Sequence, residues 1–179
     1  YNGVFENCSN LEKVNLAEGI SLLSENCFKN CTALEEVKFP QSLESIDHSA
    51  FENCIKLTSI DLPTGIQYID DDCFSGCTNL EQIMIPDSVE RISYRAFSGC
   101  EKLSSISLPD SVKEIGRSAF QDCSTLHSIS LPIGIGLIPD ECFAGCTNLV
   151  ETIIPSSVTE IGISSFEGCS KLSSVLLPD

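Results

Sequence analysis

Cysteine is the residue type in this chain most able to do chemistry, because eleven cysteines occur among 179 residues. Such a chain can carry disulfides, a metal site or a thiolate nucleophile. Eight of them recur every 23 residues and should stack in one column: Cys8, Cys31, Cys54, Cys77, Cys100, Cys123, Cys146 and Cys169. Stacked neighbours stand near or beyond the ~3.5–4.5 Å Cβ separation of a disulfide. We therefore expect buried, reduced, structural thiols.

The other three cysteines are Cys27, Cys73 and Cys142, each of which precedes a Phe where other repeats have Ala or Ser. This exchange indicates a small buried slot. Each also forms a Cys-Phe-x-x-Cys motif, whose spacing suits zinc ligands. Zinc needs four convergent ligands, however, and these motifs lie two or three repeats apart without a paired His. The sequence predicts no metal site and no cofactor.

No catalytic residues are predicted either. His48 and His127 occupy different columns of the repeat and should lie on different faces. No Ser or Cys can be assigned a base and an orienting acid. The run Asp70-Asp71-Asp72 can attract Ca²⁺, but it lacks the Gly and Glu spacing of a calcium loop, which favours a solvated turn. We expect a protein that is not an enzyme.

Composition excludes other classes of function. The 26 acidic and 10 basic residues give a net charge of −16, which argues against nucleic-acid binding and against docking on anionic membranes. No segment approaches the roughly 20 apolar residues of a membrane span. The tripeptides Asn7-Cys8-Ser9 and Asn30-Cys31-Thr32 match the pattern of N-glycosylation acceptors. The acidic excess is greater in the first half, and it can serve solubility or steer basic partners.

A repeat of 23 residues organises the whole chain. Phe recurs with the same period as the cysteine column, at 5, 28, 51, 74, 97, 120, 143 and 166, and Leu follows each cysteine by three residues. The last residues of the stretch 103–108 alternate apolar and polar, which indicates a half-buried strand, and Pro109 ends it. Apolar residues between 112 and 120 are three or four apart, which suits a second extended segment or a tight helical turn. Because one unit cannot bury its own apolar face, neighbouring units must stack.

The motif F-x-x-C-x-x-L-x-x-I-x-L-P-x-x-V-x-x-I-G-x-x-A-F resembles the BspA-type leucine-rich repeat along essentially the whole chain. The resemblance implies an inward Cys column and a spine of Phe side chains. We expect one leucine-rich-repeat solenoid over residues 1–179, with about seven repeats and partial end repeats. A parallel β-sheet should form one face, with short extended or helical turns on the other. Both ends leave apolar columns open, so we expect a fragment of a longer protein.

Columns left free by the core are the candidate partner-binding positions. They comprise the outward strand positions with two flanking residues: Lys13, Asn15, Glu36, Lys38, Ser59, Asp61, Gln82, Met84, Ser105, Ser107, His127, Ser128, Ser130, Val150, Glu151, Ile153, Ser174 and Leu176. This sheet should be charged at its N-terminal end, rich in Ser in the middle and apolar at its C-terminal end. Val150, Ile153 and Leu176 can form an apolar patch, or this end can pack on further repeats.

The family resemblance implies a protein-binding domain of a cell-surface or secreted, adhesin-like protein. Members of the family resemble surface adhesins of anaerobic bacteria and parasitic protists. The expected partners are host extracellular-matrix or surface proteins, the chain itself, and adjoining repeats or domains of the same chain. Neither nucleic-acid binding nor direct membrane insertion is expected. An intracellular scaffold or spacer is the alternative, so a cytoplasmic location stays open.

Two irregularities of the repeat lead to further predictions. Thr152 occupies a core column where all other repeats have Val or Ile. We expect it to be buried without a slip of the strand, its hydroxyl bonded to a neighbouring carbonyl. Gly19, Gly65 and Gly134 occur in the repeats that carry Cys27, Cys73 and Cys142, whereas the other repeats have Ser in place of Gly. These are two repeat subtypes. The coupling between the two positions is explained either by side-chain volumes that compensate each other on the convex side or by a shared history of repeat duplication.

Overall fold

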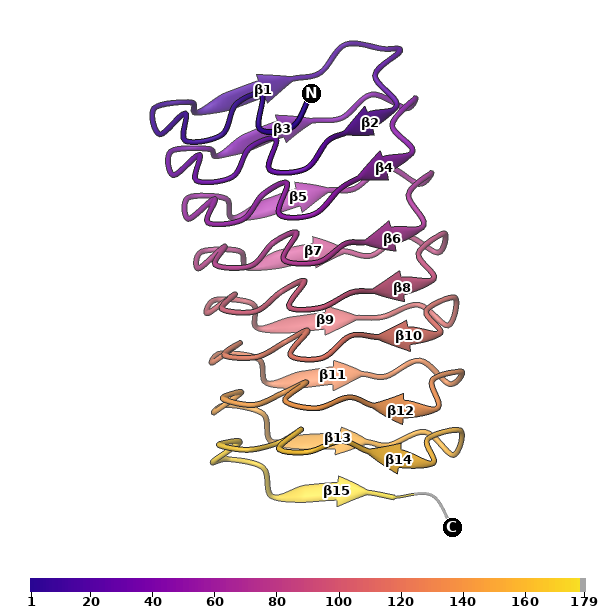
Figure 1. Cartoon of the computed structure of the whole chain (residues 1–179). Coiled ribbons are helices and arrows are strands. Elements are labelled where there is room, and N and C mark those ends of the chain that lie inside the picture. Colours follow the sequence, from indigo (N-terminus) through magenta and orange to yellow (C-terminus); the bar gives the residue numbers. More distant parts are fainter. Residues whose placement is uncertain (178–179) are drawn as a thin grey trace.

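The computed structural model describes residues 1–177, which form a stack of coils with fifteen short strands and no helix in that range (Figure 1). Three-residue strands make one side: β1 (Lys13–Asn15), β3 (Glu36–Lys38), β5 (Ser59–Asp61), β7 (Gln82–Met84), β9 (Ser105–Ser107), β11 (Ser128–Ser130), β13 (Glu151–Ile153) and β15 (Ser174–Leu176). Two-residue strands make another: β2 (Leu22–Leu23), β4 (Ser45–Ile46), β6 (Tyr68–Ile69), β8 (Arg91–Ile92), β10 (Glu114–Ile115), β12 (Leu137–Ile138) and β14 (Glu160–Ile161). We call these the long-strand sheet and the short-strand side. The predicted solenoid is confirmed, and of the two expectations for its second side the extended segment is correct.

All strand pairs are parallel and join residues 23 apart. Ile60 pairs with Ile83 between β5 and β7, and Ile106 pairs with Ile129 between β9 and β11. β3 lies beside β5, and β7 beside β9, so the long strands continue through the stack. In five of the eight long strands, β5, β7, β9, β11 and β13, the middle residue is buried while its two neighbours are exposed, as the alternating pattern predicts.

A third hydrogen-bonded column runs through the turns that contain Phe. Phe28 N–H donates to the Ala50 carbonyl of the following coil at 2.8 Å, and Phe74 N–H donates to that of Ala96 at 2.8 Å. The residues two positions before and after Phe28 have a left-handed backbone: the φ values of Asn26 and Asn30 are +59° and +60°. Asn tolerates this left-handed region better than most residues. Each coil is therefore bonded to its neighbours on three sides.

Phe side chains form a continuous ladder through the core. Eight rings stack along the molecule, from Phe5 to Phe166, with centroids 5.3–5.6 Å apart and interplanar angles of 2–22°. The six inner rings are fully buried. Such stacked pairs contribute about 0.5–1.5 kcal/mol each beyond the area they bury. The predicted Phe spine is confirmed.

Core columns are incompletely covered in the end coils, as the sequence indicates for both ends, and the expectation of a buried thiol is therefore wrong for Cys8. Phe5 is 38% exposed and Cys8 is exposed at one end, and Ile161, Val175 and Leu177 are exposed at the other. Each belongs to a column that is buried in the middle of the stack. The physical reason is that an end coil has a neighbouring coil on only one side in this structure.

The turn between long and short strands differs between the two repeat subtypes. In Ser-type repeats Val89 N–H donates to the Pro86 carbonyl at 3.0 Å, and Val112 does the same to Pro109 at 3.0 Å. In Gly-type repeats the equivalent bond is longer, at 3.5 Å from Ile66 N–H to the Pro63 carbonyl. The coupling seen in the sequence therefore has a local structural counterpart, namely a tighter turn with Ser.

Candidate partner-binding surfaces

The outward positions of the long-strand sheet lie where the sequence places them. Of the eighteen candidate partner-binding residues, Glu36, Val150 and Ser174 are half-buried and the others are exposed. Ser105, Ser107, Ser128 and Ser130 occupy the middle of the sheet in two adjacent strands. All four side chains are small and exposed.

The C-terminal part of the sheet exposes large apolar side chains. Ile153 and Leu176 are register partners in β13 and β15, and they are 65% and 57% exposed. Ile133, in the turn after β11, is 70% exposed. It lines a hollow of about 280 Å³ together with Ile153 and Pro155. We call Ile133, Ile153 and Leu176 the apolar patch. It differs from the patch predicted from sequence, because Val150 is half-buried and Ile133, which lies in a turn rather than on a strand, takes its place.

Thr152 is buried as predicted, but its hydroxyl is not bonded as predicted. The residue is 2% exposed, and it pairs with Val175 while Ile153 pairs with Leu176, so the strand has not slipped. Its Oγ1 atom is buried and has no hydrogen-bond partner within residues 1–177. The expected carbonyl bond is therefore wrong. Parallel ladders already use the strand carbonyls, and a buried hydroxyl left unpaired lowers stability.

Charged residues at the N-terminal end of the sheet form ion pairs with one another. Glu36 forms ion pairs with Lys13 at 3.2 Å and with Lys38 at 3.1 Å. Hydrogen bonds from Lys38 and Lys13 hold the pKa of the Glu36 carboxyl below its usual value. The three side chains are largely exposed, and exposed pairs of this kind add little to stability. This end of the sheet therefore presents little uncompensated charge.

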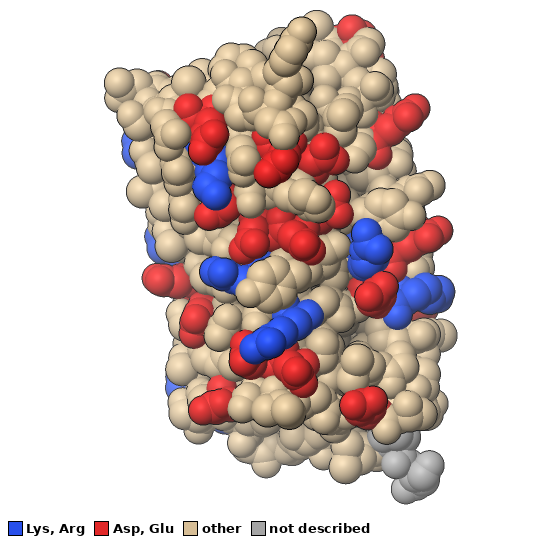
Figure 2. All heavy atoms as spheres, in the orientation of Figure 1, with Lys and Arg blue, Asp and Glu red and all other residues tan. Residues whose placement is uncertain are grey.

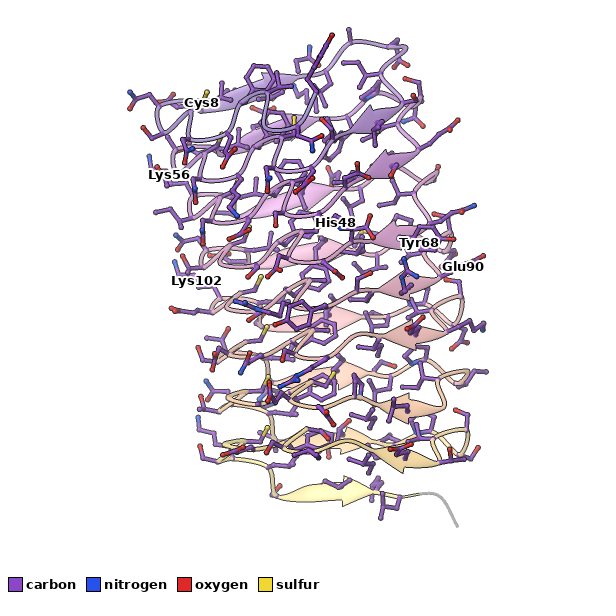
Figure 3. The ribbon with its side chains drawn as sticks, in the orientation of Figure 1. Cys8, His48, Lys56, Tyr68, Glu90 and Lys102 are labelled. Atoms are coloured by element: carbon purple, nitrogen blue, oxygen red, sulfur yellow. The ribbon has the colours of Figure 1, made fainter. Side chains whose placement is uncertain are left out.

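The two histidines lie on different sides, as predicted. His127 precedes β11 beside the long-strand sheet. His48 follows β4 on the short-strand side (Figure 3). His48 lines a cavity of about 380 Å³ with Asp70 and Asp71. Within residues 1–177, no group of three or more His, Cys, Asp or Glu side chains is placed to hold a metal ion.

The prediction of a solvated turn at residues 70–72 needs correction, because all three aspartates are half-buried. Asp70 lies 3.9 Å from Arg91, and Asp72 lies 3.4 Å from Arg95. Burial raises the pKa of both the Asp70 and the Asp72 carboxyl, against the opposing effect of nearby cations. Packing of one coil on the next takes these carboxylates partly out of water.

Sequence reasoning missed the short-strand side as a candidate surface. Its Tyr and Arg side chains come from several columns of the repeat, and no single column has the same type of residue in every repeat. One signal was present: His48, Asp71, Tyr94 and Arg117 are 23 residues apart and so occupy successive rungs. A column of large polar and aromatic residues on four neighbouring coils differs from the small residues that fill most outward positions.

Comparison with known proteins decides the family. The model of the BspA-type leucine-rich repeat region matches residues 1–124 and 78–179 and so covers the chain. The chain belongs to the BspA-type leucine-rich repeat family. Among curated protein sequences, no relative matches it.

Solved structures of bacterial leucine-rich repeat proteins share the fold of this BspA-type domain. It is 31% identical to the T. pallidum leucine-rich repeat protein, with a TM-score of 0.64, over 97% of this chain and 70% of that one. It is 25% identical to a leucine-rich cell surface protein of Faecalibacterium prausnitzii, with a TM-score of 0.59, over 99% of this chain and 62% of that one. The chain is 21% identical to the pneumococcal vaccine antigen PcpA, with a TM-score of 0.62, over 95% of this chain and 51% of that one. At this identity the likeness shows only that the two proteins share a fold.

In this BspA-type domain the cysteines are structural donors inside the coil. All eleven are free thiols, and nine are buried. Cys54 Sγ donates to the Phe28 carbonyl at 3.2 Å, and Cys77 Sγ donates to the Phe51 carbonyl at 3.1 Å, as does each column cysteine from Cys31 onward. Burial raises the pKa of Cys27 to about 11. A thiol in this setting stays protonated, which disfavours nucleophilic chemistry.

The two candidate glycosylation sites belong to an asparagine ladder. Asn30 Nδ2 donates to Asn7 Oδ1 at 2.9 Å, and Asn53 Nδ2 donates to Asn30 Oδ1 at 2.9 Å. Glycosylation would modify the Nδ2 atom that Asn30 uses as its donor. The ladder therefore gives these asparagines a structural role. Within residues 1–177, no helix is long and apolar enough to cross a membrane.

Proposed function

We propose that this chain is a protein-binding module of a cell-surface or secreted protein, and that partners dock on its long-strand sheet. The observation that carries the proposal is the apolar patch. Ile133, Ile153 and Leu176 are each more than half exposed, although most outward positions of the sheet are small or charged. Exposed clusters of large apolar side chains mark interaction sites in soluble proteins.

The energetics of the patch support docking. Burying one exposed isoleucine or leucine against a partner contributes about 1.5–3 kcal/mol. The hollow lined by Ile133, Ile153 and Pro155 offers a concave place for one apolar side chain of the partner. Three bonded columns hold the surface in shape before binding, so little ordering is lost when a partner docks.

The location and the class of partner are part of the same proposal. The F. prausnitzii relative is described as a cell surface protein, and this chain spans 62% of its length. We extend that location to the present chain and infer host extracellular-matrix or surface proteins, or the chain itself, as partners. A spacer without a ligand is the alternative function.

Surface plasmon resonance against purified extracellular-matrix proteins and against the chain itself tests the proposal. The triple variant I133S/I153S/L176S should lose binding at least tenfold. The matched control is Ile163→Ser, because Ile163 is 77% exposed near the same end of the stack but lies outside the long-strand sheet. Equal affinity of the triple variant and the wild type would exclude the apolar patch as the docking site. If the wild type bound none of the probes, the result would favour the alternative function as a spacer.

A further inference from the structure

The short-strand side gathers the residues that most often carry binding energy at protein interfaces. All three arginines of the chain, Arg91, Arg95 and Arg117, lie here on adjacent coils, with Tyr68 and Tyr94 among them. Tyr and Arg are enriched at the energetic centres of interfaces. Figure 2 shows charged side chains of both signs gathered over this side, and Figure 3 shows His48 and Tyr68 on neighbouring coils.

A cavity of about 380 Å³ opens among these residues. Its lining includes His48, Asp70, Asp71, Tyr94 and Glu114, which come from successive coils. Tyr94 is 42% exposed, and the Arg95 guanidinium lies over its ring, 5.8 Å from the centroid. A volume of this size lies at the lower end of the range for ligand pockets and suits a single side chain.

The arginines do not leave the cavity positive. Arg117 is paired with Glu141 at 2.7 Å, and Arg95 with Asp72 at 3.4 Å. The guanidinium of Arg91 lies over the Tyr68 ring, 4.7 Å from its centroid. Arg91 is thus the one arginine that lines the cavity, and its distance to Asp70 is 3.9 Å.

The carboxylates of the cavity outnumber its cations. Asp71 accepts a hydrogen bond from Tyr94 N–H at 3.0 Å, and neither Asp71 nor Glu114 forms an ion pair within residues 1–177. Asp70 is half-buried, so its negative charge is poorly solvated. Three carboxylates facing one arginine and one histidine create a negative potential, and low-dielectric walls focus it.

The lining of the cavity includes a further acceptor. Ser93 is 7% exposed and lines the cavity, and its Oγ accepts a hydrogen bond from Arg91 Nε at 3.3 Å. A hydroxyl oxygen has two lone pairs, so one remains for a second donor. A buried acceptor in a lining that also holds three carboxylates matches the several N–H donors of an ammonium or guanidinium group.

We propose that this cavity binds the side chain of a lysine or arginine presented by a protein partner, which makes the short-strand side a second docking surface. The charged head lies among Asp70, Asp71 and Glu114, and the aliphatic stem packs on the Tyr94 ring. The net charge of −16 also attracts a basic partner. This site is independent of the apolar patch on the long-strand sheet.

Amide NMR titration of the 179-residue chain with a blocked Gly-Arg-Gly peptide tests the proposal. Saturable shifts are expected at the amides of Ser93, Tyr94 and Gly116, with a millimolar dissociation constant that rises with salt. The same peptide with citrulline in place of arginine should bind at least fivefold more weakly, because it lacks the charge. No saturable shift at these amides, or equal binding of the citrulline peptide, would overturn the proposal.

Matched variants separate the cavity from general acidity. D71N/E114Q should weaken binding at least fivefold. The control D140N/E160Q removes equal charge from the same two columns outside the cavity, and Asp140 accepts the Ile163 N–H as Asp71 accepts that of Tyr94. Equal weakening by both pairs would refute the site. Glu114→Gln alone serves if the double variant unfolds, because Glu114 is exposed. Ca²⁺ producing the same shifts at lower concentration than the peptide would contradict a side-chain site.

Discussion

Raising the pH from 8 to 9.5 should strongly destabilise this protein, because its core contains protonated thiols. Nine cysteines are buried, and burial raises the pKa of Cys27 and Cys31 from 9.0 to about 11 and of the other seven further. A raised folded-state pKa leaves stability intact well below pH 9, the pKa of the unfolded thiols. Stability is lost as the pH climbs toward the folded pKa, because only the unfolded chain releases these protons.

The magnitude follows from the number of thiols. A thiol that ionises at 9.0 when unfolded and stays protonated when folded costs about 0.8 kcal/mol of stability at pH 9.5. Nine such thiols together remove roughly 7 kcal/mol between pH 8 and 9.5. Domains of this size are stable by about 5–15 kcal/mol, so the loss is comparable to the total.

Urea unfolding under anaerobic, reducing conditions at several pH values measures this effect directly. The midpoint should fall steeply above pH 8.5, at a constant m-value. The variant C100A/C123A removes two of the nine buried thiols and should show a shallower fall, although it starts from a lower stability. A free energy of unfolding that changes by less than about 1 kcal/mol between pH 8 and 9.5 would refute the reasoning.

Three substitutions test the packing in other ways, each by urea unfolding at pH 7. Phe97→Ala should lose about 3–5 kcal/mol, because Phe97 is fully buried between two stacked rings, and a loss below 1 kcal/mol would contradict the ladder. Thr152→Val should gain about 1 kcal/mol by removing an unpaired buried hydroxyl, whereas a loss would mean that this hydroxyl has a partner. Gly76→Ala should destabilise, because Gly76 has φ +71° and an added Cβ would lie 2.2 Å from Asn53 Oδ1; a neutral effect would show that this turn relaxes.

Much of the fold could be predicted from the sequence, because every column repeats without insertion. A constant period fixes which side chains face inward, so the buried Cys and Phe columns and the register at Thr152 follow from it. The period alone does not give the exposure of Cys8, which depends on the end coil having a neighbouring coil on only one side. It also does not give the state of the Thr152 hydroxyl, which depends on whether any carbonyl nearby is free.

The candidate surfaces were predictable to different degrees. Ile153 and Leu176 stand on strands, so alternation exposes them, whereas Ile133 lies in a turn where no alternation applies. The cavity on the short-strand side forms from several columns brought together by coil geometry. Its members, such as Asp71 and Glu114, are 43 residues apart in the numbering and meet only after stacking.

The central claim is that partners engage the long-strand sheet at its apolar patch, and site-directed photo-crosslinking tests it most directly. A benzophenone amino acid replaces Ser130, which lines the hollow beside Ile133, or Glu160, which is exposed in β14 on the short-strand side. Each protein is irradiated with a purified matrix protein that binds the wild type. We expect a covalent product from position 130 and none from position 160. A product from position 160 alone would contradict it.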